Sequence, residues 1–242
     1  MNLVIDIGNT RIKAALFNDD LLEDLRIFHS SEELLQDIGQ FKDASRCIVG
    51  SVVTETSNVC GQLGRYFPTT LFSAETKIPL KNLYRSVSTL GSDRIAASVG
   101  AYFLQPDKNF LVIDAGTCIK YNFTNAQNEY LGGGISPGIQ MRLISLHEHT
   151  SKLPLVKLTE DPIDLIGENT EQSILSGVVN GVISEIDGII DGYQNRFPGI
   201  LVLLTGGDSE FLAKRLKNSI FAHQNLVLKG LNDILNYNFA KV

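Results

Sequence analysis

Two segments of the sequence end an apolar run with an aspartate, followed two residues later by a glycine. Residues 3–10 read Leu-Val-Ile-Asp-Ile-Gly-Asn-Thr, and residues 111–118 read Leu-Val-Ile-Asp-Ala-Gly-Thr-Cys. A strand-end aspartate can hold Mg²⁺ together with substrate phosphates, and the amides and hydroxyls of a glycine turn can donate to phosphate oxygens. Either copy alone would also suit an ordinary aspartate-glycine hairpin. The recurrence instead predicts a duplicated domain whose two halves clamp a nucleotide in a cleft.

Two further segments combine residue types that suit phosphoryl transfer. In Gly91-Ser92-Asp93-Arg94, an aspartate beside an arginine can accept the proton of an attacking hydroxyl while the cation orients an anionic substrate. The alternative is a helix cap, in which Ser92 or Asp93 satisfies free amides and Arg94 lies in solvent. The segment Thr205-Gly206-Gly207-Asp208 suits adenine and ribose lying against its glycines, or a tight strand-to-helix turn.

Strands and helices alternate around these segments. Buried strands are predicted by apolar runs at 3–5, 47–53, 69–73, 110–113 and 200–204, with hairpin partners at 10–17 and 119–123. Helical periodicity is found at 31–41, 57–66, 92–104, 139–146, 170–193, 209–217 and 231–237. Apolar strands between helices are typical of an α/β fold. A polar break at 105–108 predicts two domains, at 1–107 and 108–242.

Composition narrows the class of protein. The chain has 242 residues, 43% of them hydrophobic, which suffices for one large core or two small ones. Its 21 basic and 27 acidic residues are scattered, so neither a nucleic acid nor an anionic membrane is expected as the partner. The three cysteines have unrelated spacings, and neither a basic leader nor a bilayer-spanning apolar stretch is expected. These features favour a cytoplasmic protein.

Taken together, the segments resemble the type III pantothenate kinases, which belong to the superfamily of acetate and sugar kinases, heat-shock chaperones and actin. The resemblance covers nearly the whole chain, and its motifs are Asp6-Ile7-Gly8-Asn9-Thr10, Tyr84, Gly91-Ser92-Asp93-Arg94, Asp114-Ala115-Gly116-Thr117, Gly132-Gly133-Gly134-Ile135-Ser136-Pro137-Gly138, Asn169-Thr170 and Thr205-Gly206-Gly207. It implies two ribonuclease-H-like domains of the actin-like ATPase type. It also implies transfer of the γ-phosphoryl group of ATP to pantothenate, the first step towards coenzyme A.

The resemblance implies roles for individual residues as well. ATP with Mg²⁺ would be bound by Asp6, Ile7, Gly8, Asn9, Thr10, Arg11, Ile12, Lys13 and Thr117. Asp114 would be a ligand of a monovalent cation, K⁺ or NH₄⁺. Asp93 would be the base that activates the primary hydroxyl of pantothenate. The pantothenate pocket would include Tyr84, Gly91, Ser92, Asp93, Arg94 and Thr170, the last reaching from the partner subunit of a homodimer. Gly177 and Gly181 on the predicted long helix would suit that dimer contact.

Some positions depart from the family pattern. Ser86-Val87 stands where asparagine-proline is common, and Cys118 and Lys120-Tyr121 stand where alanine and a later threonine are common. We expect these departures to adjust the affinity for ATP or the cation without removing activity. Two other functions stay open: another small-molecule kinase of the same superfamily, or a non-catalytic transcriptional accessory factor on the same fold.

Overall fold

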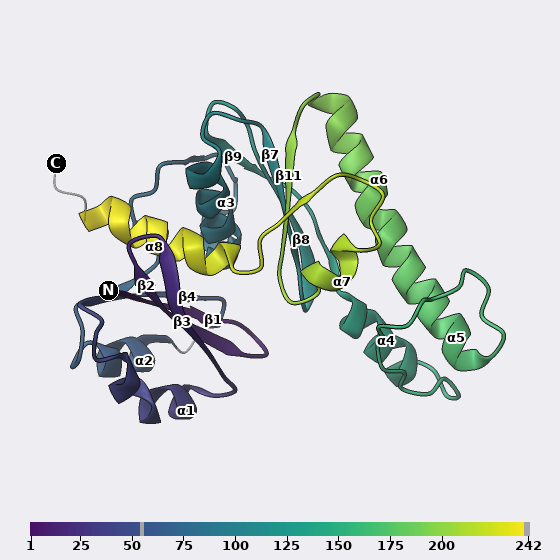
Figure 1. Cartoon of the computed structure of the whole chain (residues 1–242), viewed down its shortest axis with the longest axis horizontal. Helices are drawn as coiled ribbons and strands as arrows, with labels where there is room; N and C mark the ends of the chain where they lie inside the picture. The colour runs from purple at the N-terminus through teal and green to yellow at the C-terminus, as the bar shows by residue number, and fades with distance from the viewer. Residues whose placement is uncertain (54–55, 240–242) are drawn as a thin grey trace. The chain divides into compact units, whose positions relative to one another are not determined.

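The computed structural model describes residues 1–53 and 56–239, and the chain forms two compact units (Figure 1). The first unit contains residues 1–108, 124–132 and the C-terminal segment from Asn225; the second contains residues 109–123 and 133–224. The predicted boundary at residue 107 lies one residue before the point, after Lys108, where the chain first passes from the first unit to the second. Two segments of the predicted second half nevertheless group with the first unit, so the units are not the two contiguous halves that the sequence suggested.

A five-stranded sheet in the order β3-β2-β1-β4-β5 forms the centre of the first unit. Its strands are β1 (Asn2–Ile7), β2 (Ile12–Asn18), β3 (Leu21–Phe28), β4 (Arg46–Ser51) and β5 (Thr69–Leu71). β2 lies antiparallel to β1 and β3, whereas β4 runs parallel to β1 and β5. Leu3 and Ile5 pack on one face of β1 and Val4 on the other, because successive strand residues point to opposite sides. The predicted strands are confirmed, but the half-exposed β3 was not expected.

Helices cover both faces of this sheet (Figure 1). One face packs against α1 (Ser31–Gln36), the 3₁₀ turn Ile38–Phe41 and α2 (Thr56–Leu63). The other packs against α3 (Ser92–Leu104) and α8 (Leu226–Phe239). These two helices cross closely, since a Cβ on Gly230 would lie 1.7 Å from the carbonyl oxygen of Ala96, and one on Gly100 would lie 2.7 Å from that of Leu226. This crossing explains why the C-terminal helix belongs to the first unit.

A short strand pair completes the first unit. β6 (Lys81–Asn82) runs parallel to β9 (Glu129–Gly132), and a 3₁₀ turn at Val87–Thr89 follows β6. The Lys81 ammonium lies 2.9 Å from a Glu129 carboxylate oxygen across this pair. The pairing explains why residues 124–132 group with the first unit. Neither strand was expected, because β6 is only two residues long and β9 only four.

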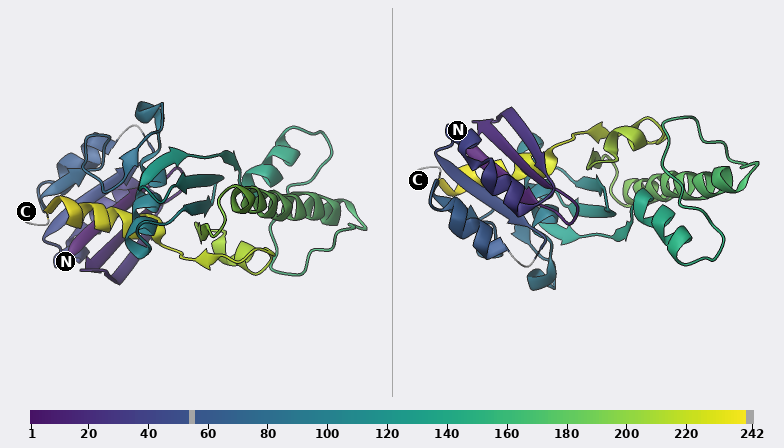
Figure 2. Two further views of the ribbon diagram at one scale, coloured as in Figure 1. Left: turned by 90° about the horizontal axis from the view of Figure 1, so that it is seen from above. Right: turned by 90° about the horizontal axis from the view of Figure 1, so that it is seen from below.

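The second unit contains β12 (Phe221–Ala222), β11 (Leu201–Thr205), β7 (Phe110–Ala115) and β8 (Cys118–Thr124) as neighbours in that order. β10 (Ile135–Pro137) pairs with β8, and β11 runs parallel to β7. The helices are α4 (Ile139–Glu148), α5 (Thr170–Leu175), a π-helical turn at Ser176–Asn180, α6 (Gly181–Arg196) and α7 (Ser209–Ala213). Leu111 and Ile113 of β7 share one core with Val182 and Ile186 of α6, the long green helix in Figure 2.

The helical run from α5 to α6 corrects one expectation. By length and composition alone, Thr170–Arg196 is apolar enough to cross a membrane, whereas the sequence was expected to contain no such stretch. In the structure, its Val179, Val182, Ile186 and Ile190 are fully buried in the core of the second unit. An apolar stripe packed in this way is typical of a core helix, which passes the same test.

Candidate active site

The first predicted phosphate turn is the loop between β1 and β2. Residues 8–11 connect the strands, and the Gly8 amide donates to the Arg11 carbonyl over 3.1 Å. Asn9, Thr10 and Arg11 lie at the surface. Asp6 is half-buried near the end of β1 and lies opposite Lys13 in the β1–β2 register.

Two predicted ATP-binding residues of this hairpin have buried side chains. Ile7 and Ile12 are 4% and 5% exposed and belong to the core beneath the sheet. Only their backbone groups can therefore contact a ligand.

The end of β4 connects this hairpin to the start of α3. Ser51, the last residue of β4, pairs in register with Ile7 of β1. The Ser92 hydroxyl donates to the Ser51 carbonyl over 2.8 Å. Because α/β proteins bind ligands at the carboxyl ends of parallel strands, this edge of the sheet is the expected place for a site. The structure thus brings the first phosphate turn and the Gly91–Arg94 segment to one edge.

Gly91 determines where the Asp93 carboxylate lies. A Cβ on Gly91 would be only 2.5 Å from Oδ1 of Asp93. The same oxygen accepts a hydrogen bond from the Arg94 amide at 2.8 Å, and Asp93 is only 8% exposed. The Asp93 carboxylate can therefore lie here only because residue 91 is a glycine.

Arg94 is buried beside Tyr84. It is 5% exposed, and its guanidinium carbon lies 5.4 Å from the centroid of the Tyr84 ring, within cation–π range. The Tyr84 ring in turn packs on Gly132, which has a φ of +101° and where a Cβ would lie 2.8 Å from Cδ2 of the ring. The first glycine of the Gly-Gly-Gly loop thus makes room for Tyr84.

These positions contradict one part of the helix-cap alternative, the solvent-exposed Arg94, whereas Asp93 does accept a hydrogen bond from a free amide of the first turn. Gly91 precedes the first helical residue, and no side chain caps it. Asp93 and Arg94 are both buried, although charged side chains are rarely buried because they lose their hydration. Two consecutive buried charges at a helix start point to a functional requirement.

A cavity of about 460 Å³ adjoins this helix start within the first unit. Its walls include Ser51, Val52, Leu90, Gly91, Ser92 and Ile95. A cavity of this size, lined by both apolar and polar groups, can accept a small molecule.

The second predicted phosphate turn is tighter than the first. β7 ends at Ala115 and β8 begins at Cys118, so Gly116 and Thr117 alone connect them. The Gly116 amide donates to the Cys118 carbonyl over 3.1 Å. The two aspartate-bearing strands are alike, whereas the loops after them differ in length.

Two glycine segments of the second unit pack against this turn. A Cβ on Gly138 would lie 2.0 Å from the carbonyl oxygen of Gly116. One on Gly206, which has a φ of +97°, would lie 2.2 Å from the carbonyl oxygen of Ala115. Thr205 also pairs in register with Asp114. Residues 136–138 and 205–208 therefore meet at the end of the strand that carries Asp114.

Asp114 makes a salt bridge that the sequence did not predict. Nζ of Lys120 lies 3.0 Å from Oδ2 of Asp114, and the two side chains are 23% and 13% exposed. Lys120 was noted only as a departure from the family pattern.

A polar network supports residues 136–137. Arg142 of α4 donates from Nε to the Pro137 carbonyl at 2.9 Å, and from Nη2 to the Ser136 hydroxyl at 2.7 Å and to Glu185 of α6. The Tyr121 hydroxyl donates to Glu185 at 3.0 Å. Partial burial favours the protonated form of Glu185, but hydrogen bonds from Arg142, Ser136 and Tyr121 outweigh it and lower the pKa of the carboxyl. No local sequence pattern signals this network, because its members come from separate elements.

Thr170, the predicted contact from a partner subunit, lies at the exposed start of α5. It lines a mainly apolar cavity of about 860 Å³ with Met141, Leu146 and Leu153. Farther along the helix, Gly177 and Gly181 are exposed, and among the described residues nothing lies within 4 Å of an added Cβ at either position. They therefore contact no other helix of this chain's described part.

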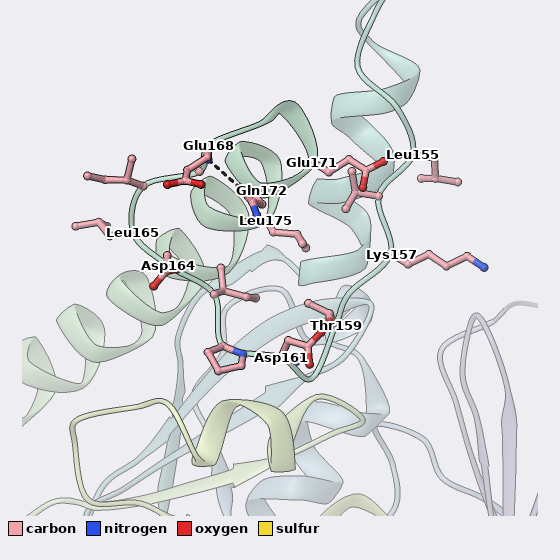
Figure 3. Close-up of a pocket in the computed structure, with 15 residues that line it drawn as sticks. Leu155, Lys157, Thr159, Asp161, Asp164, Leu165, Glu168, Glu171, Gln172 and Leu175 are labelled. Carbon is pink, nitrogen blue, oxygen red and sulfur yellow. Dashed lines mark hydrogen bonds between the residues drawn. The ribbon is translucent and has the colours of Figure 1, made fainter.

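Another cavity of about 860 Å³ in the second unit contains none of the predicted site residues (Figure 3). It lies between the loop that follows Leu155 and helix α5, and its acidic lining residues are Asp161, Asp164, Glu168 and Glu171. Such a lining repels anions, so this cavity does not suit the phosphates of a nucleotide.

Comparison with known proteins identifies the family. The profile of the type III pantothenate kinases matches residues 2–192. A type III pantothenate kinase from Flavobacterium johnsoniae is 42% identical over 240 residues, covering 98% of each chain. The chain belongs to the type III pantothenate kinase family. Another relative of that name, from Bacteroides fragilis, is 43% identical over 245 residues and covers all of both chains.

Solved structures show the fold of this family member. A Campylobacter jejuni protein, provisionally described as a Baf family transcriptional activator, has a TM-score of 0.65 at 21% identity and covers 99% of this chain and 100% of that one. An inorganic polyphosphate/ATP-glucomannokinase from Arthrobacter has a TM-score of 0.51 at 14% identity, covering 97% and 98%. At these identities the likeness concerns the fold alone. It confirms the predicted α/β fold with duplicated ribonuclease-H-like domains.

Proposed function

We propose that this member of the family transfers the γ-phosphoryl group of ATP to the primary hydroxyl of pantothenate. The product is 4′-phosphopantothenate, the first intermediate on the way to coenzyme A. The observation that carries the proposal is the buried Asp93 at the start of α3, next to Arg94, in a position for which Gly91 leaves room. It occurs in a chain that matches named pantothenate kinases over its full length.

Asp93 is the general base in this proposal. Its carboxylate accepts the proton of the pantothenate hydroxyl while the hydroxyl oxygen attacks the γ-phosphorus, and the bond to the bridging oxygen breaks so that ADP leaves. Arg94 pairs with the carboxylate end of pantothenate. Tyr84, Gly91 and Ser92 surround the substrate, and the adjoining cavity of about 460 Å³ provides room for it.

ATP binds to residues 6–13 and Thr117 in this proposal. The exposed loop after Gly8 offers backbone amides and the Arg11 guanidinium to phosphate oxygens. Asp6 suits Mg²⁺, because this ion is held by one or two carboxylates together with substrate phosphates. When bound, Mg²⁺ neutralises phosphate charge and orients the transferred group. The turn at Thr205–Asp208 takes the adenine and ribose.

The resemblance also implies K⁺ or NH₄⁺ at Asp114. This part of the proposal depends on whether the side chains around Asp114 suit such a cation. The charge of Asp114 suits a cation, but its Oδ2 already lies 3.0 Å from the Lys120 ammonium. A cation of the chain itself therefore already neutralises this carboxylate, and no step of the reaction is assigned to K⁺.

We also propose a homodimer in the cytoplasm. One exposed face of the helical run from α5 to α6 carries small residues at helical spacing, namely Ser173, Gly177, Gly181, Ser184, Gly188 and Gly192. A second helix can approach such a face closely, which would bring Thr170 to the pantothenate pocket of the other subunit. Cys47, Cys60 and Cys118 are all free, as suits a reducing compartment. Light scattering tests the dimer.

A substrate panel tests the proposed reaction. Purified protein with ATP, Mg²⁺ and KCl is assayed for ADP release with pantothenate, with hexoses and with acetate. We expect turnover with pantothenate only. Turnover with a sugar or a carboxylate, and none with pantothenate, would assign the chain to another small-molecule kinase activity. An absence of turnover with every substrate would favour a non-catalytic factor on this fold.

A further inference from the structure

The salt bridge between Asp114 and Lys120 places a positive charge of the chain itself at the second phosphate turn. Nζ of Lys120 lies 3.0 Å from Oδ2 of Asp114, and the side chains are 23% and 13% exposed. Charges buried to this extent are screened by salt much less than surface charges. The ion pair should therefore persist at ordinary ionic strength.

Both residues belong to the hairpin that we assign to ATP. Asp114 is the last residue but one of β7, Lys120 lies on β8, and only Gly116 and Thr117 separate the strands. Residues 136–138 and Gly206 pack their backbones against the same turn, and Asp114 pairs in register with Thr205 of β11. The ion pair is thus held between neighbouring strands of a rigid sheet.

A carboxylate at this position creates an electrostatic difficulty for a nucleotide kinase. Asp114 would repel the polyphosphate, which is strongly anionic, unless a cation lies between them. A bound cation is often the largest local charge in such a site. A lysine ammonium is a compact point charge with three donors, so it can contact a carboxylate and a phosphate oxygen at once.

We propose that the Lys120 ammonium supplies the single positive charge at Asp114, so that phosphoryl transfer by this chain needs no soluble monovalent cation. The proposal rests on the function proposed above, because it assumes that the turn faces ATP. The observation behind it is that the Lys120 ammonium already contacts Oδ2 of Asp114, the carboxylate that a soluble cation would otherwise neutralise. Lys120 is a positioning residue for the phosphates and takes no part in proton transfer.

The test compares salts at constant ionic strength. Initial rates with pantothenate, ATP and Mg²⁺ are measured in choline chloride and in KCl for the wild-type protein, Lys120→Met, Lys120→Arg and the control Lys152→Met, whose side chain is exposed on the same unit. The wild-type rate should change by less than about twofold between the two salts, since screening is the same in both. Lys152→Met should behave like the wild type.

Removal of the charge should create a dependence on K⁺. In choline chloride, Lys120→Met should lose about tenfold or more in kcat/KM, because a fixed charge that stabilises phosphates is missing, and KCl or NH₄Cl should restore most of that loss. Lys120→Arg keeps the charge and should stay independent of K⁺. A wild-type enzyme that works only in KCl would overturn the proposal, and so would a Lys120→Met variant that KCl does not rescue.

A binding measurement separates this proposal from the proposed reaction. Calorimetric titration with a non-hydrolysable ATP analogue and Mg²⁺ needs no pantothenate. We expect equal affinity in both salts for the wild type, and an affinity that KCl increases for Lys120→Met. A wild-type affinity that requires KCl would overturn the role of Lys120 even if pantothenate were turned over. Salt-independent affinity without turnover would support Lys120 and reject the reaction. Circular dichroism confirms that each variant is folded.

Discussion

Replacing Gly91 with alanine should displace the Asp93 carboxylate while leaving the fold intact. The new Cβ would lie 2.5 Å from Oδ1 of Asp93, whereas ordinary contacts of a Cβ begin at 3.4 Å. The carboxylate must therefore move by about 1 Å, because the clashing atom is the end of a side chain and can move. A misplacement of about 1 Å at a reacting group can cost about a hundredfold in rate. We expect kcat to fall by about that factor.

The backbone at position 91 can accept alanine. Gly91 has φ −58° and ψ 133°, which is an allowed region for any residue. The substitution should change the free energy of unfolding by less than about 1 kcal/mol, because a Gly→Ala change at a compatible site removes little besides chain entropy. Loss of activity would then reflect the carboxylate position and not unfolding.

The assay measures kcat and KM for pantothenate at saturating ATP, with urea unfolding in parallel. Gly61→Ala is the matched control, since an added Cβ there meets nothing within 4 Å and position 61 lies in α2, away from the site. It should keep the wild-type kcat. A Gly91→Ala variant with unchanged kcat would refute the reasoning, and one that raised only KM would show that Gly91 acts on substrate binding alone.

Two further predictions concern buried charges. Arg94→Lys should raise the KM for pantothenate by about tenfold with a smaller change in kcat, because lysine lacks the planar fork that pairs with a carboxylate; steady-state kinetics check this, and an unchanged KM would exclude Arg94 as the carboxylate partner. Burial raises the pKa of Asp233 to about 6 despite the opposing effect of Lys229, 2.9 Å away. Because its pKa is higher in the folded state, the folded protein binds this proton more tightly than the unfolded chain does. The protonated carboxyl therefore adds up to about 3 kcal/mol to the free energy of unfolding. This contribution is complete below about pH 4 and is lost as the pH rises to about 6. Urea unfolding of wild type and Asp233→Asn at pH 4 and 6.5 measures it; a difference in stability between the two proteins that does not change with pH would contradict the assignment.

Local sequence patterns predicted most elements of the fold, and the exceptions have physical reasons. Apolar runs such as Leu3–Ile5 gave buried strands, because a strand covered on both faces has apolar residues throughout. β6 and β9 are two and four residues long, too short to show a pattern. The grouping of α8 with the first unit depends on a glycine contact between Gly100 and Gly230, which are far apart in sequence.

The sequence predicted the charged residues of the candidate site, but not the side-chain contacts that hold them in place. The Gly-x-Asp-Arg segment was found because its residues are adjacent in sequence, and the burial of Arg94 then excluded a solvated arginine at a simple helix cap. The side chains of Ile7 and Ile12 proved to be buried, since alternate residues of a hairpin face the core. The Lys120 salt bridge and the Arg142–Glu185 network form between separate elements, and a single sequence carries no signal for such pairs.

The most direct test of the central claim is the formation of 4′-phosphopantothenate by wild type and by Asp93→Asn, measured by mass spectrometry with ATP and Mg²⁺ present. Asparagine keeps the shape of the side chain and removes its ability to accept a proton. The wild type should form the product, and Asp93→Asn should form it at least about a hundredfold more slowly while still binding a non-hydrolysable ATP analogue. Full activity of Asp93→Asn would contradict the account, as would a wild-type protein that forms no 4′-phosphopantothenate.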